Sequence, residues 1–206
     1  QFMTPGSGPV LVTITSTVGG EGKTTIGSNL GAIISLTGKR TIILNLDMRK
    51  PVLHTRFDLP NNQGISSVLA GKVSLESVIL PTANENLDII SSGPIPPNPS
   101  ELIQGKRMVE VIEKLKAAYD VIILDTPPVG LVTDAMALMK ISDISLYVLR
   151  AGYSKKAFLQ DMNRMAKEHE IKSLGLVLND LKTGRSGYGY GYGYGYGYGY
   201  YEEDKK

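Results

Sequence analysis

Residues 16–25, Ser16-Thr-Val-Gly-Gly-Glu-Gly-Lys-Thr-Thr25, combine three glycines with a lysine and three threonines. Glycines let a backbone wrap closely around phosphates with its N–H groups pointing inward. A lysine at position 23 can reach the β and γ phosphates of a nucleotide, and the hydroxyl at position 24 can ligate Mg²⁺. Apart from Thr17, which stands where the full pattern has glycine, the segment is typical of a nucleotide phosphate loop.

Two aspartates come directly after apolar runs. Asp125 follows Val121–Leu124, where a carboxylate can hold Mg²⁺ directly or through water, and Asp47 ends the run 41–46. The carboxyl ends of parallel strands meet at one edge of a sheet, so we expect both carboxylates at the same rim as residues 16–25. A solvated aspartate at a strand end is the alternative for each.

The chain ends in a glycine–tyrosine repeat that holds eight of its 11 tyrosines. Such a segment cannot build a core, so its phenols are either adhesive or open to chemistry. Glycine at every second position also opposes a stable strand. We therefore predict a disordered tail over residues 182–206, with candidate phosphate acceptors at Tyr188, Tyr190, Tyr192, Tyr194, Tyr196, Tyr198, Tyr200 and Tyr201.

The elements that must position these groups follow from hydrophobic patterning. Short apolar runs, at 10–15, 41–46, 121–124, 144–149 and 174–178, read as buried strands. Between them, apolar residues recur at helical spacing, in 24–36, 108–115 and 158–165. Continuous apolar strands alternating with amphipathic helices predict an α/β fold, a mostly parallel sheet with helices on both faces.

The middle of the chain is less regular. A short helix is expected at 65–70 and a strand at 87–90, whereas the proline-rich run 93–100 is expected to form a stiff loop without helix or sheet. The predicted organisation is a linker or added segment over residues 1–9, one domain over 10–181 and the tail over 182–206.

Composition narrows the classes of function. The net charge is only +2, so no strong attraction to nucleic acid is expected. The chain has no cysteine, which excludes disulfides and thiolate metal sites. No stretch approaches 18 uninterrupted apolar residues, so no transmembrane helix is predicted.

Four blocks together resemble the bacterial tyrosine kinases of polysaccharide export systems. They are Gly20–Thr25, Leu46-Asp-Met-Arg-Lys-Pro51, Pro96–Leu102 and Tyr119–Pro128, in the family's order. The resemblance implies a P-loop NTPase-like domain related to the MinD and ParA ATPases. It also implies Mg·ATP-dependent autophosphorylation of the C-terminal tyrosine cluster, usually in trans around a ring of subunits.

The resemblance further implies a membrane adaptor or polysaccharide co-polymerase as partner, regulation of polysaccharide polymerisation or export, and a place on the cytoplasmic side of the inner membrane. That attachment would run through an adaptor or through a missing N-terminal transmembrane region. A homo-oligomer and a tyrosine phosphatase are the other expected partners, and no nucleic acid is expected.

The same resemblance suggests roles for individual residues. The expected catalytic set is Lys23, Asp47, Asp125 and Arg49, with Asp47 orienting the phenol or accepting its proton. The expected ATP contacts are Gly19, Gly20, Glu21, Gly22, Lys23, Thr24, Thr25 and Asn179, the last resembling an adenine-reading asparagine. Thr24, Asp47 and Asp125 are the expected Mg²⁺ ligands. Solvated surface charge is the alternative for Arg49 and Lys50, and a simple turn residue is the alternative for Asn179.

Three features depart from the family pattern. Asn45 stands where the family usually has a first aspartate, so the base role falls on Asp47. Nothing before Val10 matches the family's Glu-x-x-Arg-x-x-Arg helix, which bears on ring assembly. The Gly-Tyr alternation is also stricter than in a typical tyrosine cluster.

Two other functions are compatible with parts of the sequence. A MinD- or ParA-like ATPase would share the phosphate loop, but that group carries a signature lysine where this chain has Val18. A low-complexity adhesive protein would explain the tail but not the loop. Tyr119, Tyr147 and Tyr153, outside the tail, are expected to pack or cap rather than accept phosphate.

Overall fold

A computed structural model describes residues 8–130, 134–171 and 173–182. Its seven strands are β1 (Val10–Ser16), β2 (Thr41–Asn45), β3 (Leu80–Pro81), β4 (Leu87–Ile90), β5 (Val121–Asp125), β6 (Ile144–Arg150) and β7 (Leu174–Asn179). Its helices are α1 (Lys23–Ser35), α2 (Leu53–Arg56), α3 (Ile65–Leu69), η1 (Glu76–Val78), α4 (Pro99–Gln104), α5 (Lys106–Ala118), α6 (Asp134–Ile141) and α7 (Ala157–Glu168).

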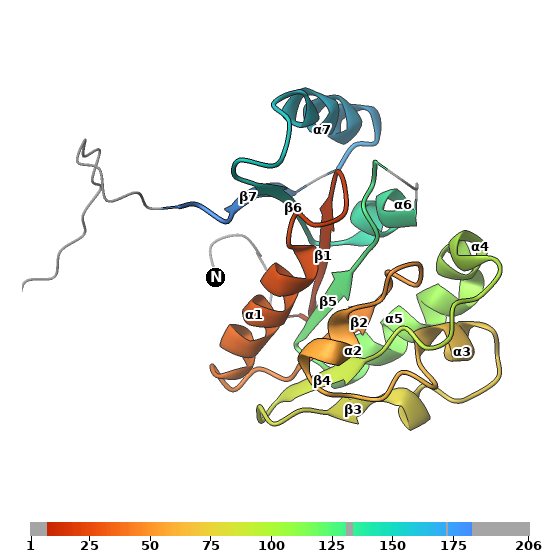
Figure 1. Ribbon diagram of the computed structural model, residues 1–206. Helices are drawn as coiled ribbons and strands as arrows, with labels where there is room; N and C mark the ends of the chain where they lie inside the picture. Colours follow the sequence, from red (N-terminus) through yellow and green to blue (C-terminus); the bar gives the residue numbers. More distant parts are fainter. Residues whose placement is uncertain (1–7, 131–133, 172, 183–206) are drawn as a thin grey trace, which may run out of the picture.

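The strands form one twisted sheet in the order β3-β4-β2-β5-β1-β6-β7 (Figure 1). All neighbouring pairs are parallel except β3 with β4. The central strands are mostly apolar and buried, as expected for a parallel sheet with helices on both faces. The parallel strands consequently bring the carboxyl ends of β1, β2, β5 and β6 to one edge.

Two hydrophobic layers fix the helices on the sheet. On one face, Ile26, Leu30 and Ile34 of α1 pack against alternate residues of β1, β2 and β5. On the other face, α3, α4, α5 and α6 contribute to a second core with the intervening strand residues. Gly31 lets α1 approach closely, because a Cβ there would lie 2.7 Å from Cδ1 of Ile43.

The register of the central strands sets the site. Asn45, the last residue of β2, is paired with Asp125, the last residue of β5, and Asp125 is paired with Ile14 of β1. Side chains in register on adjacent parallel strands lie on the same face. Asn45 and Asp125 therefore form one buried polar position, called here the β2–β5 corner.

The predicted strands and main helices are all present within three residues of their expected bounds. One expectation is partly wrong: the proline-rich run 93–100 is not free of helix, because α4 begins at Pro99. Proline is well suited to the first turn of a helix, where its missing N–H has no partner to lose. The short α2, β3 and η1 and the helix α6 were not expected from the pattern.

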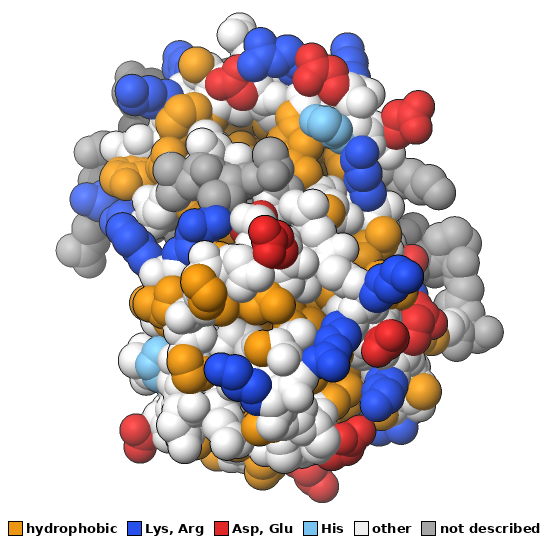
Figure 2. Space-filling view, turned by 90° about the vertical axis from the view of Figure 1, so that its right-hand side faces the viewer, with side chains coloured by type: hydrophobic (Ala, Val, Ile, Leu, Met, Phe, Trp, Pro, Cys, Tyr) orange, Lys and Arg blue, Asp and Glu red, His pale blue; other side chains and the backbone are white. Residues whose placement is uncertain are grey.

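Positive and negative side chains are interspersed on the surface shown in Figure 2, and no large area of a single charge stands out there. In the part of the chain that the structure describes, no helix is both long and apolar enough to cross a membrane. The predicted segment 1–9 lies mostly outside the described residues, and so does the predicted tail from residue 183 onward.

Candidate functional site: a phosphate-binding cleft

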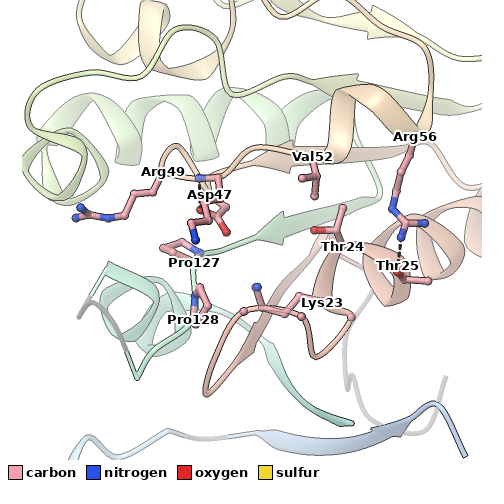
Figure 3. Close-up of a pocket in the computed structure, with 13 residues that line it drawn as sticks. Lys23, Thr24, Thr25, Asp47, Arg49, Val52, Arg56, Pro127 and Pro128 are labelled. Carbon is pink, nitrogen blue, oxygen red and sulfur yellow. Dashed lines mark hydrogen bonds between the residues drawn. The ribbon is translucent and has the colours of Figure 1, made fainter. Parts of the chain in front are cut away.

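An open cleft of about 550 Å³ lies at the carboxyl ends of β1, β2 and β5 (Figure 3). Eight predicted site residues line it: Gly19, Gly20, Gly22, Lys23, Thr24, Thr25, Asp47 and Arg49. Glu21, Asp125 and Asn179 are not among its lining residues. Most of the expected site residues thus lie in one place, and they come from two segments about 30 positions apart.

Every backbone carbonyl from residue 16 to residue 22 accepts a hydrogen bond. Val129 N–H donates to the carbonyl of residue 16 at 2.9 Å and Gly130 N–H to that of residue 17 at 3.1 Å. The Ser16 hydroxyl donates to the carbonyl of residue 18 at 2.8 Å, and the N–H of residue 26 to that of residue 22 at 2.9 Å. The three carbonyls between them accept from side chains of Tyr153, Arg150 and Asn179.

The backbone N–H groups of the same loop are left available. Among the described residues, none accepts a hydrogen bond from the N–H of residues 19–25. The loop runs into the first turn of α1, and helix N-termini favour anions. Lys23, which is 6% exposed, adds a positive charge at the cleft. Partnered carbonyls and available N–H groups are the arrangement that a phosphate group requires.

Glu21 holds the loop from the inside. Its side chain is fully buried, and its carboxylate accepts hydrogen bonds from the N–H of Val18 at 2.8 Å and from the hydroxyl of Ser154. Only the backbone of Glu21 is therefore placed to contact a phosphate. The expectation of an ATP contact at this position concerns its N–H, since its carboxylate braces the fold.

The β2–β5 corner borders the cleft through Thr24 and carries a carboxylate whose pKa is raised. Asp125 is 1% exposed, and burial raises the pKa of its carboxyl to about 6, although the Thr24 hydrogen bond and the charge of Lys23 both lower it. The Thr24 hydroxyl donates to Oδ2 at 2.7 Å. The other carboxylate oxygen, and both polar atoms of the Asn45 side chain, are buried without a partner among the described residues.

These groups fit a magnesium ion bound together with a nucleotide. Mg²⁺ is usually held by one or two carboxylates and by substrate phosphates, and it keeps several waters. Oδ1 of Asp125 has no hydrogen-bond partner among the described residues, and the Thr24 hydroxyl is bonded to the other oxygen of the same carboxylate. Within residues 8–130, 134–171 and 173–182, no group of three or more His, Cys, Asp or Glu could hold a metal alone. A nucleotide phosphate would have to complete the coordination.

Asp47 and Arg49 both line the cleft but differ in direction. Oδ1 of Asp47 accepts a hydrogen bond from the N–H of Lys50 at 3.1 Å, which fixes the carboxylate at the rim. The Arg49 side chain points away from Asp47 and Lys23 (Figure 3). Its Nη2 donates to the Ser100 hydroxyl at 3.2 Å and lies 3.8 Å from the buried Asp134 carboxylate. In this arrangement Arg49 links the cleft to α4 and α6.

Other lining residues were not predicted as site residues. Arg56, on α2, reaches across the cleft to donate a hydrogen bond to the Thr25 hydroxyl (Figure 3). Val52, Pro127 and Pro128 form apolar parts of the wall. The two prolines follow Asp125 after one residue, so the end of the predicted strand indicates that they lie near the cleft. Nothing in the local pattern around Arg56 indicates that α2 lies over the phosphate loop.

The tyrosines fall into two groups. The eight acceptor candidates, Tyr188 to Tyr201, lie outside the described residues. Tyr147 is buried and shares a 2.7 Å hydrogen bond with Thr17, and Tyr119 donates to Asp88 at 2.7 Å. Tyr153 is 52% exposed, and its hydroxyl caps a loop carbonyl. The expectation that these three pack or cap is confirmed.

Comparisons with known proteins agree with the geometry of the cleft. A family described as an AAA domain matches residues 10–172. Tyrosine-protein kinase YwqD of Bacillus subtilis is 40% identical over 84% of this chain and 73% of its own length. The kinase domain of the Escherichia coli tyrosine kinase ETK superposes with a TM-score of 0.80 at 34% identity, over 90% of this chain and 73% of that one. MinD of Pyrococcus horikoshii, complexed with Mg-ADP, has a TM-score of 0.68 at 27% identity, over 82% and 70%.

Proposed function

The chain belongs to the bacterial tyrosine-protein kinases, and from that premise we propose that it phosphorylates its own C-terminal tyrosines with Mg·ATP. The observation that carries the proposal is the cleft itself. Its loop has all carbonyls of residues 16–22 partnered and leaves the N–H groups of residues 19–25 available beside Lys23 and Asp125. This arrangement suits the polyphosphate of a nucleotide.

Phosphoryl transfer depends mainly on positioning and charge neutralisation. The loop N–H groups bind the β phosphate, and Lys23 neutralises charge between the β and γ phosphates. Thr24 and Asp125, with Asp47 at the rim, would hold the metal ion. Mg²⁺, when bound, offsets negative charge on the β and γ phosphates.

The acceptor step uses Asp47. The phenol oxygen attacks the γ phosphorus, the bond from that phosphorus to the β–γ bridging oxygen breaks, and ADP leaves. A phenol has a pKa near 10, so its proton needs an acceptor as the new bond forms. Asp47 is the cleft carboxylate that is partly exposed, and Lys50 N–H leaves its second oxygen available. Asp47 orients the phenol and receives its proton.

Arg49 has a supporting role in this scheme. Its guanidinium bonds to Ser100 and lies near Asp134, so it can reach the transferred phosphoryl only by leaving these partners. Asn45, an amide in place of the family's usual aspartate, cannot accept the proton. The amide at position 45 supports assigning the base role to Asp47.

Mass spectrometry of the chain before and after incubation with Mg·ATP tests the proposal. We expect up to eight added phosphates, all within residues 188–201. The Lys23→Met variant is expected to lose the modification, and removal of residues 183–206 is expected to abolish it while nucleotide binding persists. Unmodified tyrosines in the wild-type chain after prolonged incubation would contradict the proposal.

We propose transfer in trans, which the family resemblance implies and the tail length permits. A glycine-rich segment of 24 residues has a root-mean-square reach of roughly 25–30 Å, enough to enter the cleft of a neighbouring copy. Mixing the Lys23→Met chain with an active chain that lacks residues 183–206 separates the two routes. Phosphate on the Lys23→Met tail requires transfer between molecules, and its absence would restrict the reaction to one chain.

Self-association, a membrane adaptor and a tyrosine phosphatase complete the proposal, together with regulation of polysaccharide polymerisation or export at the inner face of the membrane. The family resemblance supports these partners. Eight phosphotyrosines add about −12 to −16 charges, whereas the chain starts at a net charge of +2. Full phosphorylation therefore favours separation of subunits. Light scattering tests this: an unchanged mass after phosphorylation would count against the charge-driven release.

A further inference from the structure

Three consecutive carbonyls of the phosphate loop accept hydrogen bonds from side chains at the far end of the sequence. The Tyr153 hydroxyl donates to the carbonyl of residue 19 at 3.0 Å, and Nη1 of Arg150 donates to that of residue 20 at 3.3 Å. Nδ2 of Asn179 donates to the carbonyl of residue 21 at 3.0 Å. Arg150 and Asn179 end β6 and β7, and Tyr153 lies in the turn that follows β6.

The direction of a carbonyl fixes the direction of the next N–H. A trans peptide is planar, so the C=O of one residue and the N–H of the following residue point in opposite directions. Donors on the outer side of carbonyls 19–21 therefore turn the N–H groups of residues 20, 21 and 22 away from β6 and β7. Gly20 and Gly22, which carry two of these N–H groups, line the cleft.

We propose that Tyr153, Arg150 and Asn179 are positioning residues that preset the phosphate loop, and that Asn179 acts on the loop rather than by reading the base. The inference rests on the proposed nucleotide site. None of the three side chains needs to touch the nucleotide. They act through the peptide groups of residues 19–22, and glycines at positions 19, 20 and 22 leave those peptides free to rotate unless they are held.

The donors are themselves held in place. Nε of Arg150 pairs with Oδ2 of Asp180 at 3.0 Å, and its guanidinium lies over the Tyr153 ring, 5.4 Å from the ring centre. The N–H of Ala151 donates to the carbonyl of Asn179 at 2.9 Å, which ties the ends of β6 and β7 together. The Arg150 and Tyr153 side chains and the Asn179 backbone are thus held by contacts that do not involve the loop.

The position of Asn179 separates loop positioning from base recognition. Gly22 has φ +98, and a Cβ at this residue would lie 2.1 Å from Nδ2 of Asn179. The amide is therefore packed against the loop backbone, and its N–H₂ group already donates to the carbonyl of residue 21. A residue committed in this way affects every ligand that carries the polyphosphate, whatever its base.

Binding of inorganic tripolyphosphate, which has no base, tests the inference by calorimetry on the full chain with Mg²⁺. Tyr153→Phe and Asn179→Ala are each expected to weaken tripolyphosphate binding about two- to tenfold, the loss of one hydrogen bond. The ratio of ADP to GDP affinity is expected to stay unchanged in Asn179→Ala. Tyr119→Phe, which also removes one tyrosine hydroxyl bond but lies outside the cleft, is the matched control and is expected to bind like the wild type.

Thermal unfolding without ligand separates positioning from general stability, since Tyr153 is half exposed and its loss of one hydroxyl is expected to leave the transition unchanged. Two results would overturn the inference. One is wild-type tripolyphosphate affinity in Tyr153→Phe. The other is an Asn179→Ala variant that loses its ADP-over-GDP preference but binds tripolyphosphate normally, which would make it a base reader. A wild-type chain that binds neither tripolyphosphate nor ADP would overturn the proposed function and, with it, this inference.

Discussion

The phosphate loop lines the cleft and the β2–β5 corner touches it through Thr24, but the two differ in how their polar groups are satisfied. In the loop, all seven carbonyls from residue 16 to residue 22 accept hydrogen bonds from the protein. In the corner, Asn45 and one oxygen of Asp125 are buried with no partner among the described residues. Burying an unpartnered polar group costs free energy, about 1–3 kcal/mol in proteins.

The difference indicates two stages of construction. Groups of the protein itself partner all the loop carbonyls, so the loop has its phosphate-binding conformation before a ligand binds. The buried polar groups of the corner gain partners only when a cation and a nucleotide bind. Ligands that supply partners for these buried groups offset the free energy lost by burying them. We therefore expect the binding of metal and nucleotide to raise the free energy of unfolding mainly through the corner.

Asp125→Asn is expected to give the largest effect. The amide oxygen can still accept the Thr24 hydrogen bond, so the fold persists, but the charge that holds the metal is lost. We expect the initial rate of phosphotyrosine formation to fall at least about a hundredfold. Stability without ligand is expected to be equal or higher, because a neutral amide costs less to bury than a carboxylate. Asp88→Asn, on β4 and outside the cleft, is the control. A rate within threefold of wild type would remove the corner from the mechanism.

Gly22→Ala is the strongest test of the preset loop. The residue has φ +98, which costs an alanine about 1–2 kcal/mol, and its Cβ would displace Asn179. We expect lower thermal stability and at least tenfold weaker tripolyphosphate binding, since a positioning bond is lost along with the loop geometry. Gly38→Ala is a matched control, because it has φ +81 with nothing within 4 Å of its Cβ.

The Gly38→Ala variant carries the backbone strain without the collision. The difference between the two glycine variants therefore measures the contact with Asn179 alone. The two variants could instead lose equal stability while Gly22→Ala binds tripolyphosphate like the wild type. The loop would then tolerate rearrangement, and its contrast with the corner would be wrong.

Most of the fold and part of the cleft were predictable because their signals are local. The strands are short apolar runs, and the glycines, Lys23 and Thr24 lie together in ten residues at a strand–helix junction. Asp125 could be placed because it ends an apolar run in a parallel sheet. The antiparallel β3 and the helical turn of α2 carry too few residues to show a period, so no pattern could indicate them.

The supports of the loop were not predictable for a different reason. Arg150 and Tyr153 lie some 130 positions from the carbonyls that they cap, and neither belongs to a motif. Their role follows from the pairing of β1 with β6, which the sequence does not specify. The inward turn of the Glu21 carboxylate toward Val18 N–H and Ser154 was equally hidden, because a glutamate in a polar loop reads as exposed.

Asn45→Asp sharpens the comparison from the corner side. The new carboxylate would lie in register with Asp125, and two buried carboxylates without a cation repel each other. We expect the free energy of unfolding in EDTA to fall by about 2 kcal/mol, and Mg²⁺ with ADP to restore most of it. Asn163→Asp, at an exposed position on α7, is the control and is expected to change stability by less than about 0.5 kcal/mol. If the unfolding curves of Asn45→Asp and the wild type coincide in EDTA, water must solvate the two carboxylates, and the corner is not excluded from solvent.

Ser154→Ala is expected to give the smallest effect. Its hydroxyl accepts from the N–H of Arg150 at 2.8 Å and donates to Glu21, so it links the β6 end to the buried carboxylate that braces the loop. Removing it takes one hydrogen bond from each partner and is expected to cost about 1 kcal/mol of stability. Ser77→Ala, which loses an exposed hydroxyl bond to a backbone carbonyl, is the control.

The Ser154 bonds are made to Arg150 and Glu21 rather than to the cleft lining, so nucleotide affinity is expected to fall less in Ser154→Ala than in Tyr153→Phe, whose bond acts directly on a loop peptide. A Ser154→Ala chain with wild-type stability but tenfold weaker nucleotide binding would reverse that order. The conformation of the loop would then depend on a bound ligand, as that of the corner does. The contrast between a loop that the protein alone satisfies and a corner that needs a ligand would be wrong.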